Sequence, residues 1–209
     1  MRGVGVIKLR RCALLTASWL AIAVSVAGGE GTSTRASSWT EQAYNELGRG
    51  RNTEAISMFQ NALKADPKSR NAWFGLATAY IQVKNYALAE RVLLKLEQSY
   101  PQDVPVKNNL AWMYATAEDP NYRDSREAVT KAREAVFLSP GSPELWSTLC
   151  EAHYLAGDYE KAFRAAEHLV DLVPRDKLAR EQARIYAEQY DKCKKAKEAM
   201  SLVEQPGGF

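Results

Sequence analysis

The chain has 209 residues, of which 46% are hydrophobic and 25% are charged. That balance is typical of a folded domain and excludes an intrinsically disordered chain. The formal net charge is +3, but residues 1–27 hold four basic side chains and no acidic one, so the rest of the chain carries 24 basic and 25 acidic residues. Nucleic-acid binding needs an excess of positive charge, and we therefore expect no nucleic-acid partner.

Residues 1–27 have the pattern of a targeting segment. A basic stretch ends at Arg11, and 16 uncharged, mostly apolar residues follow, from Cys12 to Ala27. That run is shorter than the roughly 20 residues needed to span a bilayer, and Ser25 and Ala27 are small residues where a signal peptidase would cleave. We predict a signal peptide over 1–27 and a periplasmic or secreted protein of the bacterial envelope. An uncleaved inner-membrane anchor, with the rest of the chain facing the periplasm, is the alternative.

Export to an oxidising compartment would make Cys150 and Cys193 relevant to disulfide formation. If the helices that carry them are neighbours and run parallel, Cys193 lies about nine residues further along, which is about 13 Å at 1.5 Å per residue. A disulfide needs Cα atoms within about 7 Å. We therefore predict a buried thiol at Cys150 and a surface thiol at Cys193, with no bridge between them.

Two columns of residues recur along the chain in the same steps of 34, 39 and 34 residues. The columns are Pro67, Pro101, Pro140 and Pro174, and Ala55, Ala89, Ala128 and Ala162. A fixed period of this length indicates stacked supersecondary units instead of one globular core. The organised region is predicted over 38–200, between a flexible linker at 28–37 and a flexible tail at 201–209.

Each unit has the pattern of two helices. In the second unit, apolar residues at i, i+3, i+4 and i+7 mark one face of a first helix, and a second helix then ends before Pro101. Proline cannot continue a helix and disfavours helical geometry in the residue before it, so the proline column acts as a stop signal. The face residues are Trp73, Leu76, Ala77 and Tyr80 in the first helix, and Ala89, Leu93 and Leu96 in the second.

The spacing Trp73-x2-Leu76-Ala77-x2-Tyr80, then Ala89-x3-Leu93 and Pro101, resembles the tetratricopeptide repeat. The resemblance implies an all-α fold, a right-handed α-solenoid of four helix pairs plus a C-terminal capping helix. The repeats are expected at about 36–69, 70–103, 104–142 and 143–176, with the capping helix at 177–200. Lys107 stands where the third unit should have its tryptophan. An insertion around 118–124 lengthens that unit, and Asp124 with Glu127 resembles a capping box that restarts the helix.

In this family, a stripe of positions beside the core face of each first helix lines a concave groove. We call these positions the inner stripe. Our candidate partner-binding residues there, with one neighbouring asparagine, are Tyr44, Leu47, Asn71, Phe74, Thr78, Ile81, Asn108, Trp112, Glu151 and Tyr154. One aromatic residue per unit predicts a surface that grips an apolar segment of a partner protein. The alternative is that superhelical packing or the N-terminal linker covers the row. The stripe has no lysine or arginine, which argues against the carboxylate clamp of chaperone-binding members.

Little in the sequence suggests catalysis. His153 occupies a tyrosine column and is expected in the core, and no metal-binding or glycine-rich phosphate motif occurs. We expect no cofactor and no metal. The predicted function is a non-catalytic scaffold that binds another protein and assists assembly of an envelope complex. Self-association into a homo-oligomer, or an accessory role in an envelope enzyme complex, stays open.

Overall fold

The computed structural model describes residues 32–172 and 180–203, and within them it contains nine α-helices, one short 3-10 helix and no strand. The signal peptide predicted over 1–27 and the proline at position 174 lie outside these residues. None of the helices in the described ranges is both long enough and apolar enough to cross a bilayer. The chain is an all-α solenoid, as the sequence predicted.

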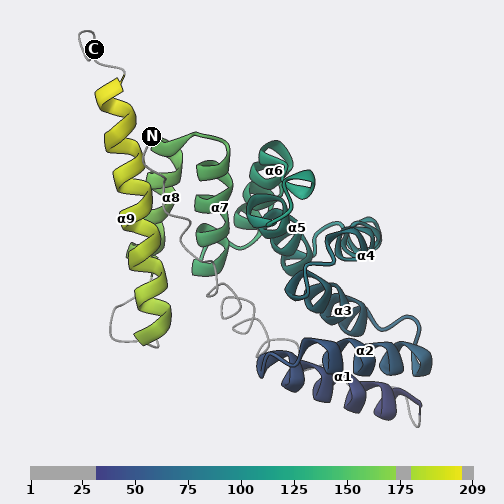
Figure 1. Cartoon of the computed structure of the whole chain (residues 1–209). Helices are drawn as coiled ribbons and strands as arrows, with labels where there is room; N and C mark the ends of the chain where they lie inside the picture. Colours follow the sequence, from purple (N-terminus) through teal and green to yellow (C-terminus); the bar gives the residue numbers. More distant parts are fainter. Residues whose placement is uncertain (1–31, 173–179, 204–209) are drawn as a thin grey trace.

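Eight of the helices form four successive pairs, and the ninth follows them. The pairs are α1 (Thr32–Gly48) with α2 (Asn52–Ala65), α3 (Arg70–Gln82) with α4 (Tyr86–Ser99), α5 (Val104–Thr116) with α6 (Ser125–Leu138), and α7 (Pro143–Leu155) with α8 (Tyr159–Leu172), followed by α9 (Arg180–Val203). The first helices of the pairs contact one another in order, α1 with α3, α3 with α5, α5 with α7, and α7 with α9. The result is a curved stack with α1 and α2 at one end and α9 at the other (Figure 1).

Short polar side chains begin several of these helices. Asp103 accepts a hydrogen bond from the backbone N–H of Val106, and Asp124 accepts from those of Arg126 and Glu127. Each bond satisfies a backbone donor that has no partner inside its helix. The helix restart expected at Asp124 is therefore confirmed.

The turn inside three of the four repeats uses the same backbone conformation. Gly50 and Gly157 have φ near 75°, and Lys84, at the equivalent place in the second repeat, has φ of 61°. This left-handed region suits glycine, because a Cβ atom there crowds the backbone. The first and fourth repeats thus turn at low energetic cost, whereas the second repeat holds Lys84 in a strained backbone conformation.

The alanine column lies where paired helices cross. Ala55, Ala89, Ala128 and Ala162 are all completely buried. A small side chain allows two helices to approach closely, and larger residues such as Phe59, Leu93 and Leu169 fill the space beside each crossing. The period read from the sequence is therefore the period of helix packing.

Both ends of the solenoid extend further than the sequence predicted. α1 begins at Thr32, inside the expected linker, because Ala36 is buried and its carbonyl accepts a hydrogen bond from the hydroxyl of Thr40. At the other end, α9 continues to Val203, inside the expected tail. The small and polar composition of this stretch looks like a linker in sequence, although Ala36 within it continues the buried face of α1.

The insertion of the third repeat is an ordered turn that packs on the second repeat. It contains the 3-10 helix η3 (Pro120–Tyr122), and the Tyr122 ring lies 5.6 Å from that of Tyr86, centroid to centroid. The Tyr86 hydroxyl also accepts a hydrogen bond from the backbone N–H of Glu118. The insertion therefore ties repeats two and three together.

Lys107, in the tryptophan position of the third repeat, lies in an ion cluster that joins α4, α5 and α6. Its ammonium group is 3.1 Å from Glu97 and also contacts Glu134, while Lys131 is 2.9 Å from Glu97. Lys107 is only 8% exposed. A buried lysine needs such partners, because an unpaired charge in a protein interior is very costly.

Both cysteines are free thiols, and Cys150 is buried as expected, but the prediction of a surface thiol at Cys193 was wrong. Cys193 is buried, and its Sγ atom lies 2.8 Å from that of Cys150. The two helices do lie side by side, but the expected offset of nine residues assumed that both helices start at the same level. In the structure Ser147 of α7 pairs with Gln189 of α9, so the N-terminal end of α9 extends past the N-terminal end of α7. This register brings Cys193 level with Cys150, and the nine-residue offset disappears.

Candidate functional site

The inner stripe lies on α1, α3, α5 and α7, and none of its ten candidate residues is fully exposed. Leu47, Thr78 and Asn108 are buried, and the half-buried residues are Tyr44, Asn71, Phe74, Ile81, Trp112, Glu151 and Tyr154. Contacts between neighbouring repeats therefore cover part of the row. The four aromatic residues differ in what covers them.

Tyr44 is a packing residue between the first two repeats. Its hydroxyl donates a hydrogen bond to the backbone carbonyl of Asn71 over 2.9 Å, and its ring meets that of Phe59 edge-on with 5.0 Å between centroids. Burial raises the pKa of the Tyr44 phenol well above its ordinary value. A side chain held in this way contributes to stability more than to recognition.

Phe74 lies beneath a cation that comes from the start of the same helix. The guanidinium carbon of Arg70 is 4.9 Å from the centre of the Phe74 ring. Arg70 also donates two hydrogen bonds to the carboxylate of Asp103, over 2.6 and 2.7 Å, and one to the side-chain oxygen of Asn71. The bidentate pair fixes the guanidinium above the ring, so one face of Phe74 is occupied.

Tyr154 is covered in a similar way by the last helix. The ammonium nitrogen of Lys192 lies 3.8 Å from the centre of the Tyr154 ring and 2.6 Å from a carboxylate oxygen of Glu151. Burial alone would lower the pKa of Lys192, but the Glu151 carboxylate outweighs it and raises that pKa. Glu151 also accepts a hydrogen bond from Gln189. Both stripe residues of the fourth repeat are therefore engaged with α9.

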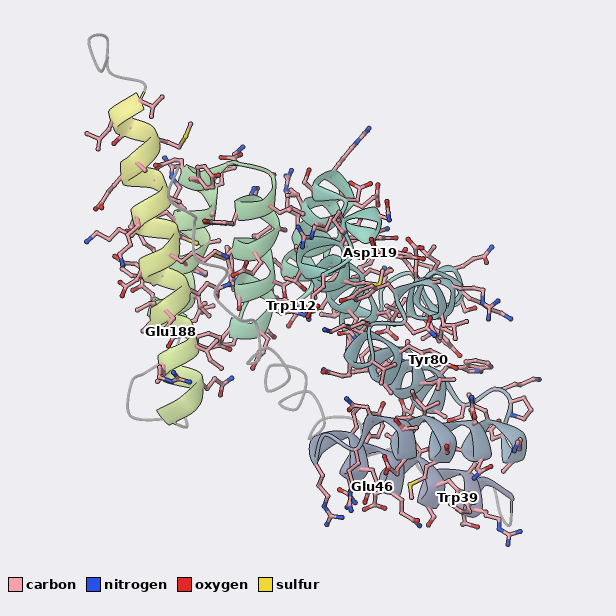
Figure 2. The ribbon with its side chains drawn as sticks, viewed as in Figure 1. Trp39, Glu46, Tyr80, Trp112, Asp119 and Glu188 are labelled. Carbon is pink, nitrogen blue, oxygen red and sulfur yellow. The ribbon has the colours of Figure 1, made fainter. Side chains whose placement is uncertain are left out.

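Trp112 is the exception among the four aromatics. Tyr44, Phe74 and Tyr154 each pack against a hydrophobic core, whereas Trp112 belongs to neither core. Within residues 32–172 and 180–203, its indole has no ring contact and no hydrogen bond. Figure 2 shows it on the inner side of the curve, between α5 and α7, with Asp119 on the outer side.

A second unsatisfied group lies one helical turn away. The side-chain oxygen of Asn108 is buried and has no hydrogen-bond partner in the described part of the chain. An unpaired buried acceptor costs about 1–3 kcal/mol, and native proteins hold few of them. Asn108 and Trp112, four residues apart on α5, thus supply an unpaired acceptor and an unpaired donor on one face.

The charges around the stripe were not apparent from its sequence. Its positions hold no lysine or arginine, yet the fold brings Arg70 and Lys192 onto two of its rings. Arg70 is the first residue of α3 but lies outside the stripe positions, and Lys192 comes from α9, so counting the stripe positions misses both. Asp103 and Glu151 neutralise these cations, which supports the expectation that no carboxylate clamp is present.

The histidines lie in structural positions. His153 is buried, and burial lowers its pKa although Asp158, 4.0 Å away, opposes that effect. His168 packs against Trp146 in a tilted arrangement, with 4.1 Å between ring centres. Over the described ranges, no group of three or more His, Cys, Asp or Glu residues has a geometry that could hold a metal ion.

Comparison with known proteins agrees with this architecture. The family model of the tetratricopeptide repeat matches residues 46–112, which run from α1 into α5. Residues 46–112 therefore carry tetratricopeptide repeat sequence. The matched segment holds the second repeat, whose tryptophan, alanine and proline positions carried the resemblance in the sequence.

Several solved structures share the fold, and two of the following three are of TPR proteins. TTC0263, a thermophilic TPR protein of Thermus thermophilus, is 19% identical with a TM-score of 0.61, and the match covers 82% of this chain and 92% of that one. MamA of Desulfovibrio magneticus RS-1 is 18% identical with a TM-score of 0.56, over 66% and 75% of the two chains. YrrB, a TPR protein with an unusual peptide-binding site, is 18% identical with a TM-score of 0.55, over 68% and 71%.

The curated relatives that match are far longer proteins. Human Superkiller complex protein 3 is 29% identical over 85 residues, which is 41% of this chain and 5% of the human protein. Superkiller protein 3 of Schizosaccharomyces pombe is 24% identical over 124 residues, covering 58% of this chain and 9% of that protein. The likeness is therefore confined to a small part of each relative.

Proposed function

We propose that this tetratricopeptide repeat protein is a non-catalytic scaffold that binds an extended segment of another protein along the inner stripe, centred on Trp112 and Asn108. The observation that carries the proposal is the state of Trp112, a half-buried indole that packs against neither core and whose N–H lacks an acceptor in the described part of the chain. Tryptophan is among the residues most enriched at the energetic centres of interfaces.

The chemistry of the stripe specifies the segment. An apolar side chain of the partner packs against the Trp112 ring, and a backbone carbonyl of the partner accepts the indole N–H. An extended peptide presents backbone carbonyls that are not paired within the peptide itself. The two cations next to the stripe are already paired, so an acidic tail gains little there.

The test begins with capture of the partner in cells. A photo-crosslinking amino acid replaces Ile81 on the inner stripe, and in a matched control it replaces Phe137, which lies on α6 and is 85% exposed. We expect a protein that crosslinks from position 81 and not from position 137, identified by mass spectrometry. A copy of this chain as the only captured species would support self-association instead.

The affinity of the identified segment then tests Trp112 directly. Trp112→Ala is expected to weaken binding about 30-fold or more, the effect of losing an interface residue worth about 2 kcal/mol, with unchanged helix content by circular dichroism. Phe137→Ala removes an exposed aromatic ring outside the stripe and should change the affinity less than about twofold. Equal binding by both variants and the unaltered protein would exclude the stripe as the binding site.

For location, we propose export to the bacterial envelope, with assembly of an envelope complex as the role. The sequence of residues 1–27 supports export, since a basic stretch precedes 16 uncharged residues. Mass spectrometry of the protein from the periplasmic fraction is expected to show a chain that begins after Ala27. An intact chain in the membrane fraction would support the anchor alternative, and an intact soluble chain in the cytoplasm would contradict export.

A further inference from the structure

Cys150 of α7 and Cys193 of α9 face each other inside the interface between the fourth repeat and the last helix. Their Sγ atoms are 2.8 Å apart, and both residues are completely buried. A disulfide bond is about 2.05 Å long, so closing the remaining gap requires movement of less than about 1 Å. The contact joins residues 43 positions apart in the chain.

Polar contacts on both sides hold the two sulfur atoms together. One turn before Cys150, Ser147 donates a hydrogen bond to Gln189 over 2.8 Å, and Gln189 donates to the Ser147 carbonyl over 2.9 Å. Next to the cysteines, the Lys192 ammonium lies 2.6 Å from the Glu151 carboxylate. These pairs fix the register of α9 against α7, so the sulfur contact is part of the docked helix and does not depend on a mobile loop.

We propose that Cys150 and Cys193 form an intramolecular disulfide that fastens α9 to the fourth repeat. The inference rests on this geometry and is independent of the proposed binding of a partner. The bond covalently closes the end of the solenoid, where α9 covers the apolar side chains of α7 and α8 that a further repeat would otherwise cover.

The oxidant is a disulfide, either that of a thiol–disulfide oxidoreductase or a small-molecule disulfide. One cysteine thiolate attacks an oxidant sulfur, which forms a mixed disulfide and releases the first oxidant thiolate. The second cysteine thiolate then attacks the mixed disulfide at the sulfur of the first, which forms the Cys150–Cys193 bond and releases the second oxidant thiolate. Two electrons and two protons pass from the cysteine pair to the oxidant disulfide, which ends as two thiols. Because both sulfurs are buried once α9 docks, this exchange takes place during folding.

The test uses the full chain with Cys12→Ser, so that this pair holds the remaining thiols. The protein is refolded with oxidised glutathione, denatured, and treated with a maleimide that adds a large mass tag. We expect a monomer with no tag and a mass about 2 Da below that of the reduced chain, since glutathione capping would add mass instead. Two tags per chain, or a covalent dimer on a non-reducing gel, would overturn the proposal.

A second measurement asks whether the bond stabilises the docked helix. Reducing agent should lower the thermal midpoint of the oxidised protein by about 5–15 °C, the range expected when a disulfide closes a loop of this length in a chain of this size. The matched variant Cys150→Ser in the same background should show no response to the reductant. A midpoint that reductant leaves unchanged in the oxidised protein would also overturn the proposal.

Discussion

The indole nitrogen of Trp146 donates a hydrogen bond to the backbone carbonyl oxygen of Pro140, with 2.7 Å between the two atoms. In the second repeat, Trp73 makes the same bond to Pro67 over 2.9 Å. The proline and tryptophan columns, six residues apart in both repeats, are thus joined by direct contact. In the third repeat Lys107 takes the tryptophan place after Pro101, and an ion cluster takes the place of the hydrogen bond.

Replacing either tryptophan by phenylalanine should cost the protein that hydrogen bond. We expect Trp73→Phe and Trp146→Phe each to lower the free energy of unfolding by about 0.5–1.5 kcal/mol, the net worth of one hydrogen bond, measured by urea denaturation. Trp112→Phe is the control, because its indole has no hydrogen bond in the described structure. An equal loss in all three variants would mean that ring size, and not the bond to proline, sets the effect.

Gly75 on α3 has no room for a side chain. A Cβ atom at this position would lie 2.2 Å from the Phe59 ring. Glycine to alanine inside a helix normally stabilises a protein by about 1 kcal/mol, but here we expect Gly75→Ala to destabilise it by about 1–3 kcal/mol through overpacking. In a double-mutant cycle, Phe59→Leu should recover part of that loss, and additive effects would contradict the clash.

Gly157 is constrained by its backbone and not by its surroundings. Nothing lies within 4 Å of a Cβ atom at this turn, yet its φ of 75° is in the left-handed region. Gly157→Ala should lower the free energy of unfolding by about 1–2 kcal/mol, and Gly157→Asn by less, because asparagine tolerates this conformation. Phe59→Leu, which should rescue Gly75→Ala, should have no effect on this loss.

The ion cluster around Glu97 should make stability depend on acid pH. Burial alone would raise the pKa of Glu97, but hydrogen bonds from Lys131 and Lys107 outweigh it and hold the pKa below the ordinary value of 4.5. The unfolded chain binds that proton first as pH falls, so this contribution to stability is present above about pH 4.5 and is lost as pH falls through the folded-state pKa. Urea denaturation from pH 6 to pH 3 should show a smaller decline for Glu97→Gln than for the unaltered chain. A parallel decline would assign the acid sensitivity to other carboxylates.

The repeat architecture could be predicted because its signals are local and recur. Pro67 and Pro101 end helices through their own ring geometry, and Ala55 and Ala89 mark the crossings, so each unit confirms the register of the next. The insertion changed one period to 39 without disturbing the columns, and its ordered turn between α5 and α6 is where the surplus residues were expected.

What could not be predicted depends on how helices slide and pack against one another. The register of α9 against α7 comes from side-chain pairs such as Ser147 with Gln189, and counting residues from expected helix starts placed Cys193 at the surface. Cover by packing was one of the two alternatives for the inner stripe, but the cations were missed, because Arg70 and Lys192 reach its rings from outside the counted positions.

Lys107 distinguishes the third repeat from the other repeats of the solenoid. Similar units in tandem can dock on the wrong neighbour while the chain folds, since each presents nearly the same apolar face. The ammonium group of Lys107 is satisfied only when Glu97 from the preceding hairpin and Glu134 from its own are both in place. A misaligned stack would separate Lys107 from Glu97 and leave it with Glu134 alone, so the residue that breaks the repeat consensus also penalises docking on the wrong hairpin.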